Sequence, residues 1–188
     1  MKTNLEICID SCSGIDAAVE GGADRIELCS SLEYGGLTPT IEVLKHASEC
    51  GIQARSMIRP RKGDFVYSLE ELKKMQSDID MVRSFNIDGV VFGATLPNGN
   101  LDQDLLEELI SYSVGFKKTL HRAVDTMPRT KDSVQIGIQL GFETILSSGG
   151  KNTALEGLSV LSEMHKLASG KLTLCRDQGS TQKALRRS

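Results

Sequence analysis

The sequence lacks any long apolar run. No stretch approaches the ~18 consecutive apolar residues that a membrane-spanning helix needs. The start, Met1-Lys2-Thr3-Asn4, leads into a short strand-like run and not into the apolar core of a signal peptide. We therefore expect a cytoplasmic protein with no membrane partner.

An excess of positive charge is also missing, since the formal net charge is -3. Without a positive field, nucleic acid is not an expected partner. The 188 residues are 39% hydrophobic and 25% charged, which is ordinary for a globular protein of one domain.

Paired cysteine motifs are absent. The five cysteines are Cys8, Cys12, Cys29, Cys50 and Cys175, and no two of them are spaced as CxxC. An odd number without a secretory signal argues against a disulfide framework, and the spacing excludes zinc ribbons and thioredoxin-type motifs. We expect free thiols.

What the sequence does contain is a regular alternation of short aliphatic runs and longer amphipathic stretches. Ser68–Phe85 is the clearest helical stretch, because it opens on a Ser-x-x-Glu capping box and continues with a 3.6-residue apolar period. Seven runs are predicted strands: Leu5–Ile9, Arg25–Cys29, Gln53–Arg59, Gly89–Ala94, Phe116–Ala123, Glu143–Ser147 and Lys171–Cys175.

The spacing of these units favours a barrel. Strand starts from Leu5 to Lys171 recur every ~28 residues, close to the ~31 of a (β/α)8 barrel. A doubly wound sheet is the alternative. Too few apolar residues follow Cys175 to build an eighth unit, so we expect an incomplete TIM-type α/β barrel over residues 1–175 and a divergent, disordered polar tail over 176–188.

One pattern of residues occurs twice, in Leu5-Glu6-Ile7-Cys8 and in Ile26-Glu27-Leu28-Cys29. Side chains two apart in a strand share a face, so both Glu-Cys pairs face the barrel interior if the aliphatic residues pack against helices. Buried carboxylates are costly unless they are paired or bind a metal. These pairs therefore indicate a site.

The two cysteines of this pattern could bind copper. Neighbouring strands lie ~4.8 Å apart, which brings Cys8 and Cys29 together near the C-terminal rim. Two thiolates are soft ligands suited to Cu(I), with Met57 as a thioether neighbour. The alternative is that both cysteines are small buried hydrophobes.

Two more groups of polar residues follow strand ends. Arg59, Arg61 and Asp64 surround a Pro-Gly turn, and arginines there suit the capture of phosphate or carboxylate. A solvated charged loop is the alternative. The backbone of 147–150, Ser-Ser-Gly-Gly, is a weaker candidate for binding an anion.

The other group is His121, Arg122 and Asp125, at the rim where TIM barrels carry their active sites. His121 suits acid–base chemistry or metal ligation. The alternative is a core histidine paired with Asp125 or Glu27.

The remaining candidates carry weaker signals. Cys12, Cys50 and Cys175 lie in a loop, near a helix end and at the end of the last strand, and we do not expect them to be ligands. His46 and His165 fall in helical stretches and are predicted to lie on the surface.

Six blocks of this sequence, in this order, closely resemble the CutC family: LEICIDS, GADRIELCSSLEYGGLTP, MIRPRKGDFVYS, DGVVFGAT, TLHRAVD and ILSSGGKNTALEGL. The resemblance covers Leu5 to Leu174. It implies a TIM-type barrel, a cytoplasmic location and a role in copper homeostasis, with Cu(I) bound by a pair of strand-end cysteines that correspond to Cys8 and Cys29.

The resemblance also implies a polar pocket. Its residues are Glu6, Glu27, Arg59, Arg61, Asp64, His121, Arg122 and Asp125. The sequence departs from the family pattern from Cys175 onward, where family members continue through a Gly-rich loop, a helix and a final strand.

Three functions follow as hypotheses. The first is a Cu(I)-binding protein of copper homeostasis. The second is an enzyme acting on a small anionic substrate, with Glu27, His121 and Asp125 as catalytic residues and Arg59 and Arg61 as an anion clamp. The third is a degenerate barrel that self-associates through exposed strand edges, which would make the protein a homo-oligomer.

Overall fold

The computed structural model describes residues 4–177, which form one curled sheet of seven parallel strands in the order β1 to β7. Its strands are β1 (Glu6–Ile9), β2 (Arg25–Leu28), β3 (Ala54–Met57), β4 (Gly89–Phe92), β5 (Lys117–Leu120), β6 (Thr144–Ser147) and β7 (Thr173–Arg176). Within the described chain, the backbones of β1 and β7 do not pair with each other, so the sheet stays open. The predicted incomplete TIM-type barrel is confirmed.

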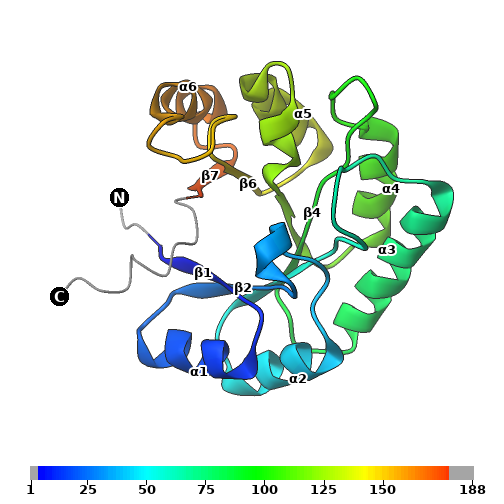
Figure 1. Cartoon of the computed structure of the whole chain (residues 1–188), viewed down its shortest axis with the longest axis vertical. Coiled ribbons are helices and arrows are strands. Elements are labelled where there is room, and N and C mark those ends of the chain that lie inside the picture. The colour runs from blue at the N-terminus through cyan, green and yellow to red at the C-terminus, as the bar shows by residue number, and fades with distance from the viewer. Residues whose placement is uncertain (1–3, 178–188) are drawn as a thin grey trace.

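Helices connect the strands and cover the outside of the curl (Figure 1). They are α1 (Cys12–Glu20), α2 (Ile41–Cys50), α3 (Leu69–Arg83), α4 (Gln103–Tyr112), α5 (Ser133–Leu140) and α6 (Leu158–Ala168). The predicted capping box is present at the start of α3, where Ser68 and Glu71 each accept the other's backbone N–H. None of the described helices combines the length and apolar character that crossing a membrane requires.

The core lies between the sheet and these helices. Ile26 and Leu28 on β2 point outward and are fully buried, as are Leu44 on α2 and Ile79 on α3. Each such side chain contributes roughly 1.5–3 kcal/mol when it leaves water. Along each strand, every second side chain packs outward against the helices, and the side chains between them point into the interior of the curl.

That interior is polar. Cys8 on β1 contacts Glu27 on β2, and Arg55 on β3 reaches across to hydroxyls of β5 and β6, Thr119 and Thr144. The Glu-Cys pairs therefore face inward, as the alternation predicted. Polar side chains line the inside of the curl on β1, β2, β3, β5 and β6, whereas β4 contributes the apolar Val91.

Each predicted strand differs from the observed one by one to three residues at one or both ends, and two of these differences affect the rim. The fifth strand ends at Leu120, three residues early, because the His121 side chain caps a 3-10 helix over Arg122–Thr126. The last strand continues through Arg176, so the predicted tail begins inside β7. Residues 178–188 lie outside the described residues.

Candidate functional site

The Glu27 carboxylate lies between two thiols inside the curl. Its Oε1 accepts the Cys8 thiol at 3.4 Å and the Cys29 thiol at 3.8 Å. β1 and β2 are in a register that pairs Cys8 with Glu27, which places both sulfur atoms against one oxygen. The repeated Glu-Cys pattern thus converges on a single point.

Burial sets the protonation of this group. Burial first, and then the negative charge of Glu6, raises the pKa of Glu27 to about 7. Cys29 is 1% exposed, and burial followed by the charge of Glu27 raises the pKa of its thiol well above the ordinary value. Cys8 is exposed as a residue, yet its thiol is largely surrounded by protein, so burial and then Glu27 raise the pKa of that thiol too. Both thiols keep their protons in the metal-free protein.

One side of the Cys29 sulfur is apolar. Cys29 packs with Met57 on β3 and Val91 on β4 in a small buried cluster. A Cβ at Gly36 would lie 2.8 Å from the Cys29 Sγ and 3.5 Å from the Met57 methyl group. The predicted thioether neighbour is therefore beside the thiol.

Glu6 on β1 is a second acidic residue of the site and lies on the side of β7. Glu6 accepts Arg25 Nη2 at 2.5 Å and the Cys175 thiol at 3.8 Å. Burial first, and then the charge of Glu6, raises the pKa of Cys175 to about 12. No pattern in the sequence pointed to Cys175, because its contact with Glu6 joins the first and last strands of the sheet.

His121 and Arg59 both contact the Phe65 ring. The Arg59 guanidinium carbon is 4.7 Å from the Phe65 ring centre, and the Phe65 and His121 ring centres are 4.9 Å apart. Carbonyl oxygens of Tyr34, Gly36 and Gly63 hold Arg59, which is 5% exposed. The Arg59 Nε is buried and has no partner among the described residues.

His121 is a buried, neutral imidazole. Its Nδ1 accepts the Ala123 backbone N–H, which places the ring proton on Nε2, and that atom is buried without a partner in the described part of the chain. Burial, followed by the positive charge of Arg59, lowers the pKa of His121 to about 3. Neither Asp125 nor Glu27 satisfies the ring, contrary to the alternative drawn from the sequence.

Arg61 and Asp64 belong to another network. The Arg61 guanidinium bonds Glu71 at the start of α3, the Asp64 carboxylate and the Val66 carbonyl. Asp64 is largely exposed. The predicted clamp of Arg59 with Arg61 is therefore divided between two sets of partners, and only Arg59 faces His121.

Asp125 and Arg122 bind one another and the loop after β6. Asp125 accepts the Ser147 hydroxyl and the backbone N–H groups of Ser148 and Gly150, while Arg122 bonds Asp125 and Asp177. Burial acts to raise the pKa of Asp125, but these hydrogen bonds outweigh it and lower that pKa. The loop at 147–150 does bind an anion, and the anion is the protein's own Asp125.

Sequence reasoning missed Arg25 and Arg55. Burial, and next the positive charge of Arg25, lowers the pKa of Arg55, which is 3% exposed. The signal was available, because Arg25 shares a strand face with Glu27 and Cys29, and Arg55 with Met57 and Arg59.

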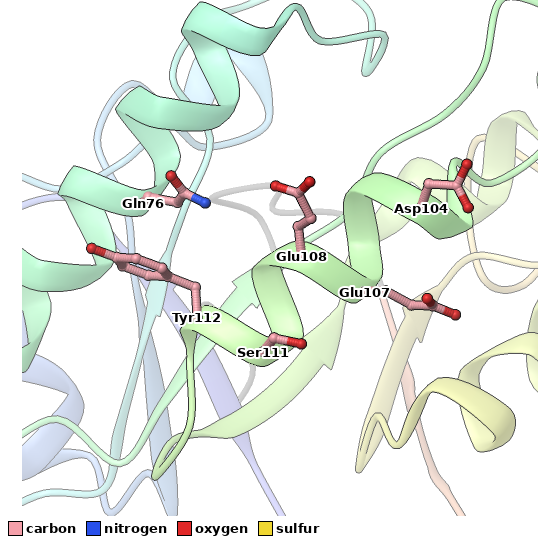
Figure 2. Close-up of a pocket in the computed structure, with 6 residues that line it drawn as sticks. All are labelled: Gln76, Asp104, Glu107, Glu108, Ser111 and Tyr112. Carbon is pink, nitrogen blue, oxygen red and sulfur yellow. The ribbon is translucent and has the colours of Figure 1, made fainter.

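An open groove of about 510 Å³ lies elsewhere, between α3 and α4 on the outside of the barrel (Figure 2). Gln76 of α3 faces Glu108 and Tyr112 of α4 across it, and Asp104 and Glu107 line its far end. None of the residues selected from the sequence lines this groove. The chemistry is concentrated inside the curl.

Comparisons with known proteins point to one family. A profile described as the CutC family matches residues 3–185, past the point where the sequence suggested a divergent tail. A CutC family protein of Agrobacterium fabrum is 45% identical over 170 residues, which are 90% of this chain and 68% of that protein. A human protein named copper homeostasis protein cutC homolog is 38% identical over 97% of this chain and 67% of its own length.

A solved structure supports the same relationship. The CutC protein from Streptococcus agalactiae superposes with a TM-score of 0.85 at 30% identity. The superposition covers 92% of this chain and 86% of that one.

Proposed function

Because this chain belongs to the CutC family, whose human relative is named a copper homeostasis protein, we propose that it binds Cu(I) through Cys8 and Cys29. The observation that carries the proposal is the Glu27 oxygen shared by the two thiols. We place this function in the cytoplasm, where thiols stay reduced.

The donor atoms suit a soft monovalent ion. Thiolate and thioether ligands select Cu(I), and Cys8, Cys29 and Met57 offer these groups on three neighbouring strands. An ion that binds must displace the thiol protons. Glu27, with a pKa of about 7, can take up one of them, and the positive charge of Arg59 acts to lower the pKa of Cys29.

Titration with Cu(I) tests the proposal. Under anaerobic conditions and against a competing chelator, the wild-type chain should bind tightly, and the Cys8→Ser, Cys29→Ser double variant should lose that binding. Cys12→Ser is the matched control, since its thiol lies on α1. If the double variant still binds Cu(I) tightly, Cys8 and Cys29 are not the copper ligands.

A second function is supported by the two unpartnered donors, His121 Nε2–H and Arg59 Nε–H. Both side chains contact Phe65, and we infer that one small anion accepts from both. A neutral imidazole with its proton on Nε2 donates to a developing negative charge and does not act as a base. Glu27 would be the acid–base group, because its pKa of about 7 matches neutral pH.

Inorganic phosphate is the probe for this second function. If the donors bind anions, phosphate should raise the melting temperature of the wild-type chain and not that of His121→Asn. An equal rise in both would place the anion elsewhere. Cys8→Ser should bind phosphate as the wild type does, and this result separates the second function from copper binding.

A further inference from the structure

Outside the barrel, α1 and α2 bring three different metal-binding side chains together. Asp16 lies on α1, and His46 and Cys50 lie on α2. The Asp16 carboxylate oxygen, a ring nitrogen of His46 and the Cys50 Sγ are all within 4.8 Å of one another, and Asp16 Oδ1 is 2.7 Å from His46 Nε2. The two helices lie next to each other on the outer surface (Figure 1).

Helix geometry explains the convergence. His46 and Cys50 are one turn apart, so their side chains share the face of α2 that meets α1. Asp16 comes from a different helix, thirty positions earlier. This separation is why no local spacing in the sequence pointed to the group.

We propose that Asp16, His46 and Cys50 form a binding site for a zinc-like divalent cation. Imidazole, carboxylate and a single thiolate are the mixed nitrogen, oxygen and sulfur donors that Zn²⁺ accepts. Three protein ligands leave the fourth tetrahedral position for water. This donor set is harder than the two thiols and thioether of the interior, so the two sites differ in the metal they select.

The surroundings favour a cation. Asp16 and Glu49 place negative charge near the Cys50 thiol, and a bound divalent cation offsets that charge. The side chains of Asp16 and His46 are 57% and 32% exposed, so an ion reaches them from solvent without any movement of the fold.

The competing explanation is a plain surface ion pair between His46 and Asp16, with Cys50 nearby by chance. Exposed ion pairs contribute little and do not need a third partner. The two explanations differ in one respect, which is whether Cys50 and a metal are involved together.

Zinc titration against a chromophoric chelator decides between them. His46→Gln and Asp16→Asn should each weaken the binding of one Zn²⁺ by at least about 10-fold. Loss of a residue that only supports a metal ligand already weakens metal binding by about that factor, and the loss of a ligand itself should cost no less. His165→Gln, an exposed histidine on α6, is the matched control and should bind as the wild type does. Every variant keeps Cys8 and Cys29, so any zinc bound in the interior of the barrel is the same in all of the proteins compared.

Co²⁺ adds a readout that an ion pair cannot produce. The wild-type protein loaded with Co²⁺ under reducing conditions should show a thiolate-to-cobalt charge-transfer band, and Cys50→Ser should lose it while Cys175→Ser keeps it. Equal zinc affinity in His46→Gln, Asp16→Asn and the control, or a charge-transfer band unchanged in Cys50→Ser, would overturn the site. Matching far-ultraviolet circular dichroism of the metal-free variants shows that a loss is not unfolding.

Discussion

Gly36 lets the loop after β2 approach the Cys29 thiol. Its φ of +83° is in the left-handed region, and a Cβ there would stand 2.8 Å from the sulfur. Its carbonyl oxygen also accepts Arg59 Nη1. We predict that Gly36→Ala costs about 1–2 kcal/mol for the backbone and a further ~1–3 kcal/mol for overpacking, and that it weakens Cu(I) binding.

Gly141→Ala is the control for this substitution, because its φ is +81° and nothing lies within 4 Å of the added Cβ. Urea unfolding should show the backbone cost alone in Gly141→Ala, with Cu(I) affinity unchanged. If the two variants lose equal stability, the Cys29 sulfur does not limit the space at Gly36.

Glu27 makes stability depend on pH with an unusual sign. The folded chain holds the Glu27 proton up to about pH 7, whereas the ordinary pKa of this group is 4.5. Between these values the folded state binds more protons than the unfolded state, so the free energy of unfolding falls as pH rises. The difference corresponds to roughly 3 kcal/mol.

We predict that Glu27→Gln removes this decline. Urea unfolding at pH 5 and pH 8 should show that the variant gains stability relative to the wild type as pH increases, since all other groups titrate alike in both. A wild type and variant that change in parallel would mean that Glu27 is ionised throughout.

Which residues point inward was predictable wherever a strand pattern was clear. The alternation in Leu5–Cys8 and Ile26–Cys29 predicted the inward thiols and carboxylates, and the structure has them inward. The partner of each residue was not predictable, because hydrogen bonds such as that of His121 to the Ala123 backbone depend on the local turn. The metal role of these residues stays a prediction.

Among the helices, α3 has the most explicit start signal. Ser68 accepts the Glu71 N–H, and the Glu71 carboxylate accepts the Ser68 N–H and also binds Arg61. We predict that Ser68→Ala lowers the free energy of unfolding by about 1 kcal/mol.

Ser111→Ala, at an exposed position inside α4, tests whether that loss comes from the cap. Alanine is the better helix former in a helix interior, so this control should be neutral or slightly stabilising in urea unfolding. Equal destabilisation of both variants would argue against the capping box.

Element boundaries were predicted less well than element types. The segment Phe116–Ala123 reads as one strand, yet its last residues turn into the 3-10 helix that His121 caps. Apolar residues such as Ala123 and Val124 are buried there as they would be in a strand. Burial alone therefore does not reveal where the backbone changes direction.

For the whole molecule, the open sheet predicts a gradient of stability. Strands β3, β4 and β5 are hydrogen-bonded on both sides, whereas β1 and β7 each pair with one neighbour in the described chain. We predict that backbone amides of β1 and β7 exchange with deuterium faster than those of β3 to β5, as measured by mass spectrometry.

Deuterium exchange measured at increasing protein concentration tests whether the protein forms the predicted homo-oligomer. Protection of β1 and β7 that rises with concentration would mean that a second copy covers these edges. If β1 and β7 are as well protected as β4 at the lowest protein concentration, the predicted gradient of stability across the sheet is wrong.

The topology followed from the sequence because each strand is separated from the next by one amphipathic stretch. Such crossovers place consecutive parallel strands side by side, which gives the observed order. Contacts across the curl did not follow from it. The Cys175 thiol lies 3.8 Å from Glu6 because twist accumulates over seven strands, and no local pattern encodes that sum.

The Arg122 guanidinium has a consequence for motion at the rim. It joins the turn after β5, through Asp125, to Ser148 after β6 and to Asp177 after β7. None of these three segments can swing away without breaking bonds that the others share. Their fluctuations should therefore be correlated, with one common exchange rate, and access to the interior past this side of the rim would be all-or-none.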